Sequence, residues 1–213
     1  MGIAAIQALA APHFLDIFGA FHATSEDGCA PGTLVLLSPQ EPGFWPHITA
    51  EPEFADAAAD PIDRWSTRVI GALADTLGGT ALFPFGGPPY TPFIRWAERT
   101  GRAWPSPVGM LVHDTAGLMI SIRGAVLVSN LLDLPAPSTN PCIGCARPCL
   151  TACPVGALGP QPYDVPACHV HLDSREGLDC LTEGCLVRRA CPVSQRFGRD
   201  PAQTAHHMRH FHN

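Results

Sequence analysis

The sequence contains no lysine and little charge of either sign, and these absences limit what the protein can bind. All thirteen basic residues are arginine, charged residues make up 15% of the 213-residue chain, and the net charge is −6. This balance disfavours a broad nucleic-acid footprint, which needs clustered positive charge. No apolar run approaches the roughly 20 residues that span a bilayer, so we expect no membrane partner.

The N-terminal residues lack the positive charge of a secretory signal. Residues 3–11 are apolar and residues 8–10 resemble a cleavage site, but the first basic residue is Arg64. A signal peptide needs a basic segment before its apolar run, so we expect a cytoplasmic protein. In that reducing compartment, clustered cysteines more often bind metal or carry out redox chemistry than form structural disulfides.

Cysteine and charge divide the chain unequally. Eight of the nine cysteines follow residue 140. Six arginines stand against thirteen acidic residues before that point, and seven stand against six after it. The proline-rich residues 134–141 between the two parts are typical of an extended linker. We therefore predict an α+β domain over residues 1–137 and a smaller domain over residues 138–213.

The first domain shows helix and strand patterns. Asp60 and Pro61 are typical of a helix start, and apolar residues recur at four-residue spacing up to Gly78 and Gly79. A second helix is expected at 91–100. Runs rich in Val, Leu and Ile predict strands at 33–37, 80–83, 110–113, 118–122 and 125–129, with a hairpin turn at 114–117. Helices interspersed among five strands indicate an α+β or α/β layer.

A compact cysteine run opens the second part. Cys142, Cys145, Cys149 and Cys153 have the spacing C-x2-C-x3-C-x3-C-P. Short spacers let consecutive thiolates surround one cluster, and the following proline turns the chain away so that residues 155–158 can begin a short helix. The run resembles that of bacterial ferredoxins, C-x2-C-x2-C-x3-C-P, including the sequence Cys-Pro-Val-Gly-Ala. It differs by one extra residue in the middle spacer.

A looser second set follows, and its last member repeats the end of the first. Cys168, Cys180, Cys185 and Cys191 have the spacing C-x11-C-x4-C-x5-C-P. In two-cluster ferredoxins the fourth cysteine of each run binds the other cluster. The resemblance therefore implies one [4Fe–4S] cluster on Cys142, Cys145, Cys149 and Cys191, and a second on Cys153, Cys168, Cys180 and Cys185.

Two other readings of the eight cysteines stay open. Two zinc sites of four cysteines are possible, although zinc ribbons usually pair two C-x2-C knuckles and only Cys142 and Cys145 form one. Disulfides would form in an oxidised preparation. Two clusters would add about −4 of charge to this part. Five arginines are placed to offset that charge or simply to face solvent: Arg147, Arg188, Arg189, Arg196 and Arg199.

Residues 81–97 and 106–125, together with the downstream cysteines, resemble a group of bacterial ferredoxin-like proteins. That group is distantly similar to the cobalamin-processing (type C methylmalonic aciduria) family and to epoxyqueuosine reductase. The resemblance implies a nitroreductase-like sandwich domain that binds a corrinoid or a flavin, followed by a ferredoxin-like domain. No G-x-G-x-x-G or P-loop sequence is present, so nicotinamide or ATP binding has no support.

A flat ligand in the first domain would need close backbone approach and an apolar wall. Gly86 and Gly87 precede two prolines in a rigid bend. Phe85 and Tyr90 flank it, and Arg123 is placed to hold a phosphate or to pair with an acidic neighbour. An apolar wall would comprise Phe83, Phe85, Tyr90, Phe93 and Trp96. The alternative is a tight turn whose aromatic residues belong to the core.

Three further features are expected to be structural. His113 fits a core or edge histidine better than a ligand. Acidic neighbours should raise the pKa of the Cys29 thiol, which argues against a nucleophile. The histidine-rich residues 205–212 fit a docked or frayed terminal helix, with adventitious metal binding as the alternative.

These observations lead to an expected function. The first hypothesis is electron transfer through two [4Fe–4S] clusters to a redox partner protein or a small-molecule substrate. The second is an oxidoreductase whose first domain binds cobalamin or flavin and is reduced by the clusters. The third is a structural zinc protein without redox activity.

Overall fold

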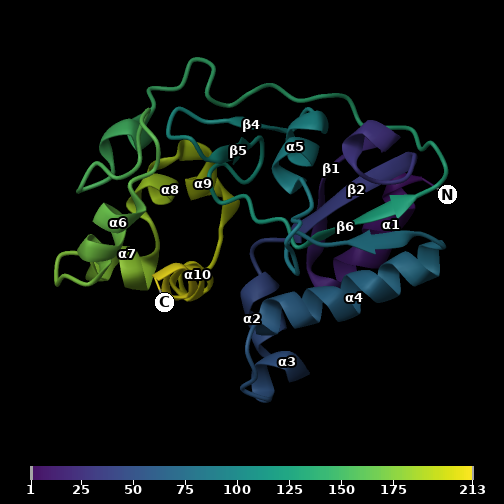
Figure 1. Ribbon diagram of the computed structural model, residues 1–213, viewed down its shortest axis with the longest axis horizontal. Helices are drawn as coiled ribbons and strands as arrows, with labels where there is room; N and C mark the ends of the chain where they lie inside the picture. The colour runs from purple at the N-terminus through teal and green to yellow at the C-terminus, as the bar shows by residue number, and fades with distance from the viewer. Residues whose placement is uncertain (1, 213) are drawn as a thin grey trace. The chain divides into compact units, whose positions relative to one another are not determined.

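The computed structural model describes residues 2–212, and the chain divides into two units (Figure 1). One unit comprises the chain up to Arg102 together with Ser121–Ser138. The other comprises Ala103–Ile120 and the chain from Thr139 onward. The predicted boundary at residue 138 lies at the third and last crossing between the units. The segment Ala103–Ile120 joins the cysteine-bearing unit, although it lies far before the cysteines in the sequence.

The first unit is built on an antiparallel sheet of four strands. The strand order is β1–β2–β6–β3, with β1 at Leu15–Ala23, β2 at Gly32–Pro39, β6 at Gly124–Val128 and β3 at Thr80–Leu82. Every residue of β2 and β6 is buried. Both strands are therefore covered on both faces, which accounts for their continuous apolar sequences.

Helices cover the sheet of the first unit. The helix α4 (Pro61–Leu77) packs against β6 and β3 and buries Trp65, Val69 and Ile70 along one stripe. It ends at Gly78, whose φ of 62° is the left-handed conformation that favours glycine at this position. The other helices are α1 (Ile3–Ala10), α2 (Phe44–Thr49), α3 (Pro52–Ala55) and α5 (Phe93–Arg99), with 3-10 turns η1 (Ala11–His13) and η2 (Ser25–Asp27).

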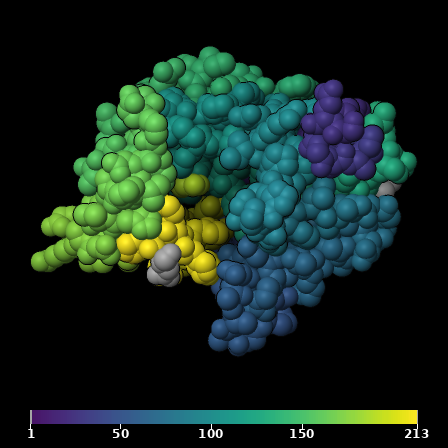
Figure 2. Space-filling model, viewed as in Figure 1, coloured from purple at the N-terminus to yellow at the C-terminus, as the bar shows by residue number. Residues whose placement is uncertain are grey.

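The second unit combines a small hairpin with short helices. The strands β4 (Ala103–Pro105) and β5 (Leu111–His113) pair antiparallel and lie beside α8 (Leu186–Ala190) and α9 (Pro192–Phe197) in Figure 1. The terminal helix α10 (Pro201–His212) packs against α7 (Leu178–Glu183), and Figure 2 shows its yellow surface next to the green surface of the preceding helices. The helical elements are η3 (Pro148–Thr151), α6 (Val165–Leu172), α7 (Leu178–Glu183), α8 (Leu186–Ala190), α9 (Pro192–Phe197) and α10 (Pro201–His212).

Most predicted elements are present, and the coarse α+β class is confirmed. The helix at 61–77 and the strands at 33–37, 80–83, 110–113 and 125–129 are confirmed to within a few residues. The predicted helix at 91–100 is present as the shorter α5. Asp60, however, makes no side-chain capping bond and has a φ of 51°. No helix among the described residues has both the length and the apolar character needed to cross a bilayer.

Two predicted elements are wrong, and β1 and α1 were not predicted. Residues 118–122 form no strand, because the Leu118 amide donates to the Ser194 hydroxyl at 2.8 Å and not to a neighbouring strand. Residues 155–158 form a turn and a bend, with Gly156 at a φ of 65°, and no helix. The strand β1 is buried on both faces apart from a few positions, so it lacks the alternation that would reveal a half-buried strand.

Candidate metal centres

Four cysteines line one cavity of about 430 Å³ in the second unit. Cys142, Cys145 and Cys149 come from residues 142–149, and Cys191 comes from the junction between α8 and α9. The lining between the thiols is mainly apolar. It comes from the hairpin segment (residues 103–120), from the cysteine loop (residues 141–149) and from α9, and includes Val112, Leu118, Ile143 and Val193. The structure thus brings together three cysteines of the first run and the last cysteine of the second.

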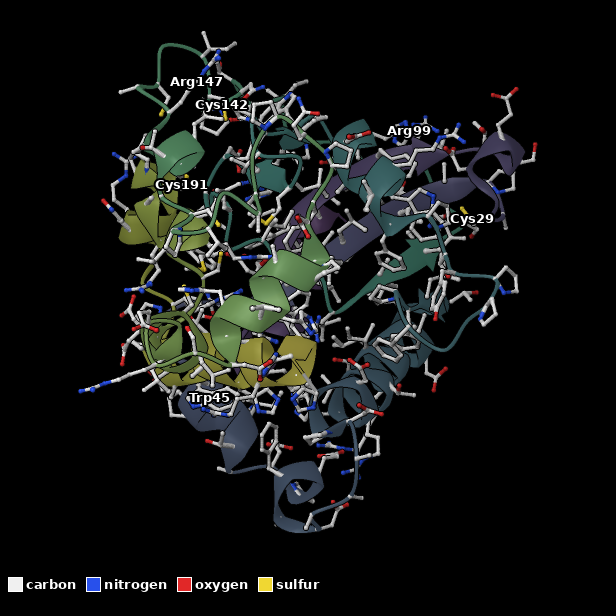
Figure 3. All side chains as sticks on the ribbon, turned by 60° about the vertical axis from the view of Figure 1, so that its left-hand side comes forward. Cys29, Trp45, Arg99, Cys142, Arg147 and Cys191 are labelled. Carbon is white, nitrogen blue, oxygen red and sulfur yellow. The ribbon has the colours of Figure 1, made fainter. Side chains whose placement is uncertain are left out.

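The loop that carries the first three cysteines is curled by local interactions. Gly144 and Arg147 have φ values of 74° and 55°, both in the left-handed region. The Cys142 amide donates to Asn140 Oδ1 at 2.9 Å, and the Arg147 amide donates to Cys145 Sγ at 3.3 Å. The three thiols of this loop line the same cavity. Figure 3 shows Cys142, Arg147 and Cys191 in this part of the molecule.

The other four cysteines line a second cavity, which is much smaller. Cys153 follows η3, Cys168 lies in α6, Cys180 lies in α7, and Cys185 precedes α8. The lining is otherwise apolar except for His171. Its volume of about 20 Å³ is close to the roughly 10–15 Å³ that one water needs. The second set thus has the same four donors as the first. Its cavity is too small for an inorganic cluster unless the surrounding side chains move apart.

Burial and mutual proximity shape the pKa values of these thiols. Burial, followed by the neighbouring thiols, raises the pKa of Cys142, Cys149 and Cys168. Burial also raises the pKa of Cys180. A thiol must lose its proton to bind metal, so these groups are neutral at pH 7 until a cation replaces their protons.

Cys191 differs from these cysteines. Burial acts to raise its pKa, but hydrogen bonds led by those from the backbone of Ser194 and Leu118 outweigh burial, and the pKa is lowered. The Cys191 sulfur therefore lies in a site that already stabilises its thiolate.

Within the described residues, neither set of thiols is arranged around a single metal ion. All nine cysteines are free of disulfides. Among residues 2–212, no group of three or more His, Cys, Asp or Glu side chains is arranged to hold one metal ion. Four thiolates around one zinc ion lie about 3.8 Å apart, given Zn–S bonds of about 2.3 Å and tetrahedral geometry. A cubane cluster separates its ligands further, because each thiolate binds a different iron.

The residues predicted to bind a flat ligand lie in the first unit and line neither cysteine cavity. Gly86 and Tyr90 are exposed, and Phe85 and Gly87 are partly buried. Arg123 precedes β6 and pairs with Asp63 at 3.5 Å. Of the two roles considered for Arg123, this contact is the pairing with an acidic neighbour.

The five aromatic residues proposed as a wall do not form one surface. Phe83 stacks on Phe85 with ring centroids 5.1 Å apart. Phe93 and Trp96 are core residues, and the Trp96 indole donates to the Asp27 carbonyl at 3.0 Å. Tyr90 is 68% exposed. For Phe93 and Trp96, the core alternative is therefore the correct one.

The features expected to be structural behave as such. His113 is fully buried, and its Nδ1 accepts from the Thr115 amide at 3.2 Å. Burial, followed by Asp27, raises the pKa of Cys29, which belongs to the other unit. The histidine-rich end of the chain forms α10, where His212 Nε2 lies 3.0 Å from Asp173 Oδ1.

Sequence reasoning missed the residues around the thiols that are not cysteines. The hairpin segment supplies Gly117, whose position would place a Cβ 2.9 Å from Cys191 Sγ. Tyr163 is hydrogen-bonded to Cys168 through their side chains, and its pKa is raised by burial and then by this bond. Glycine at a tight turn was a signal in the sequence, but nothing there connected that turn to Cys191.

Comparisons of the chain with protein-family models, with curated proteins and with solved structures found no match. The resemblances drawn from the cysteine run and from the first domain therefore stay predictions. The residues of the two cavities are the features of this chain that bear most directly on its function.

Proposed function

We propose that the second unit is an electron-transfer module that holds two [4Fe–4S] clusters. One observation carries the proposal. The eight cysteines separate into two groups of four, each lining its own cavity, and the groups exchange Cys153 and Cys191 between the two sequence runs. This exchange is the pattern of two-cluster ferredoxins. If closeness in the sequence alone decided the grouping, each cysteine run would line its own cavity.

The chain itself keeps the two cavities close together. Cys185 of the second cavity immediately precedes α8, and Cys191 of the first immediately follows it. Five helical residues rise about 7.5 Å. Cys149 and Cys153 are likewise joined through the single turn η3. When bound, each cluster would accept and release one electron, and these two short connections hold the ligands at a separation on the order of 10 Å.

The residues around the thiols are suited to stabilising negative charge. The lining of the first cavity includes Arg147 and Arg196 and no acidic residue. Arg188 lies in α8, the helix between Cys185 and Cys191, and its guanidinium donates to the Leu118 carbonyl at 2.8 Å. Four thiolates and a cluster carry net negative charge, and cations and hydrogen bonds near the ligands favour the more reduced state.

We infer that the two units are a nitroreductase-like α+β domain and a ferredoxin-like domain. The antiparallel sheet covered by α4 supports the first assignment, and the two cysteine groups support the second. A cobalamin- or flavin-dependent reductase stays a prediction, since no cavity described above includes the residues expected to bind those ligands.

Electron uptake tests the proposed function. The full chain, purified and reconstituted with iron and sulfide without oxygen, is titrated with dithionite while its visible absorbance and its electron paramagnetic resonance are followed. We expect a brown protein that takes up two electrons per chain. The matched control carries Cys142→Ala and Cys168→Ala together, one substitution in each cavity, and should take up none. A colourless protein that takes up no electrons would overturn the proposal.

A further inference from the structure

The turn that follows β5 lies directly against Cys191. Gly117 has a φ of 58°, and a Cβ there would lie 2.5 Å from the Ser194 amide nitrogen and 2.9 Å from Cys191 Sγ. Its amide and carbonyl pair with those of His113 at 2.9 and 3.0 Å, so the turn is held in place. Only a residue without a side chain allows this approach.

Two residues, one before and one after Cys191, form hydrogen bonds to the backbone of this turn. Ser194, three residues after Cys191, accepts from the Leu118 amide at 2.8 Å through its hydroxyl, which also donates to the Ala116 carbonyl at 3.4 Å. Arg188, three residues before Cys191, donates to the Leu118 carbonyl at 2.8 Å. Ser194 and Leu118 are both buried, so water does not compete for these bonds.

We propose that the turn at residues 116–118, held by Ser194, is a hydrogen-bonding cover that raises the reduction potential of the cluster bound through Cys191. Ser194 and Gly117 are positioning residues, because they place the backbone of the turn against Cys191. This inference rests on the proposed function. The backbone amides of Ser194 and Leu118 hydrogen-bond to Cys191, and hydrogen bonds to a ligand sulfur stabilise the added negative charge of the reduced state.

The matched substitutions Ser194→Ala and Ser106→Ala test the role of the cover. Ser106 lines the same cavity and is also buried, but its hydroxyl accepts from the Val108 amide at 3.4 Å, and Ser106 lies in the connection between β4 and β5. The readout is an electron paramagnetic resonance redox titration of each reconstituted full chain. Ser194→Ala should shift one of the two midpoint potentials to a more negative value, by about a three- to tenfold change in the reduction equilibrium, where tenfold corresponds to about 59 mV. Ser106→Ala should leave both potentials unchanged.

Gly117→Ala provides a second variant in case Ser194→Ala does not fold. The added methyl group must push the turn away from Cys191 and Ser194. The same midpoint potential should fall, and the resonance Raman bands of the iron–sulfur bonds should change for one cluster only. In a Cys168→Ala background, which lacks one ligand of the second set, the shift should persist, because the affected cluster is the first.

The outcomes separate this inference from the proposed function. A chain that binds no iron overturns the proposed function and this inference with it. Two clusters whose potentials are the same in Ser194→Ala, Gly117→Ala and the unsubstituted protein overturn this inference alone. An equal shift in Ser106→Ala would also overturn it, because the effect would then come from any loss of a hydroxyl in the cavity wall.

Discussion

The exchange of two cysteines between the cavities gives the most specific prediction. Cys153 belongs to the compact first run in the sequence but lines the second cavity, and Cys191 belongs to the second run but lines the first. We expect Cys153→Ala to behave like Cys168→Ala, and Cys191→Ala to behave like Cys142→Ala. Alanine is chosen because it leaves no ligating atom.

The size of the effect follows from the two ligand sets. Each cavity is lined by four cysteines and the two cavities share none. One substitution therefore removes a ligand from one cluster and leaves the other set complete. Iron should fall from about eight to about four per chain, since each cluster holds four irons. Cys29→Ala, in the other unit, is the control and should keep all of the iron.

The assay combines iron and sulfide analysis with electron paramagnetic resonance of the reduced protein. Two different residual spectra are expected, one shared by the Cys142 and Cys191 variants and one shared by the Cys153 and Cys168 variants. The reasoning is refuted if Cys153→Ala leaves the same spectrum as Cys142→Ala while Cys191→Ala leaves that of Cys168→Ala. Each run would then hold its own cluster, and the geometry of the cavities would not describe the loaded protein.

Two further predictions concern ion pairs and histidines. Arg99→Met should lower the free energy of unfolding by about 2 kcal/mol at pH 7, because it leaves the buried Asp27 carboxylate without its partner, while partial exposure of Arg99 limits the loss. Denaturant unfolding measures it against Arg95→Met, an exposed control on the same helix, and equal stabilities would contradict the prediction. The pKa of His206 is lowered to about 4 by burial and then by His210, so its nuclear magnetic resonance signals should stay those of a neutral ring at pH 5–6. Because the unfolded chain binds this proton first, stability should fall as the pH decreases from 6.5 toward 4; a ring that titrates near 6.5 would contradict the assignment.

The sequence predicted best those features that depend on local patterns. The helix at 61–77 has an apolar stripe and a terminating glycine, and these act within the segment itself. The cysteine groups also follow a spacing rule, because short spacers bring consecutive thiols together. The exchange of Cys153 and Cys191 was available only through the ferredoxin resemblance, since no local property links residues 38 positions apart.

The features that sequence reasoning missed depend on contacts between distant segments. Residues 118–122 have the composition of a strand, but the Leu118 amide bonds to Ser194, 76 residues away. The hairpin Ala103–Ile120 looked like part of the first domain, yet its Val112 and Leu118 pack with Cys149 and Cys191 in one apolar cluster. Tertiary packing overrides local propensity in such segments.

Metal and sulfide analysis of the full chain purified without oxygen tests the central claim most directly. The account predicts about eight irons and eight inorganic sulfides per chain with little zinc, together with a broad visible absorbance that dithionite bleaches. A colourless protein with about two zinc ions per chain and no sulfide would contradict it, because the eight thiols would then hold single ions.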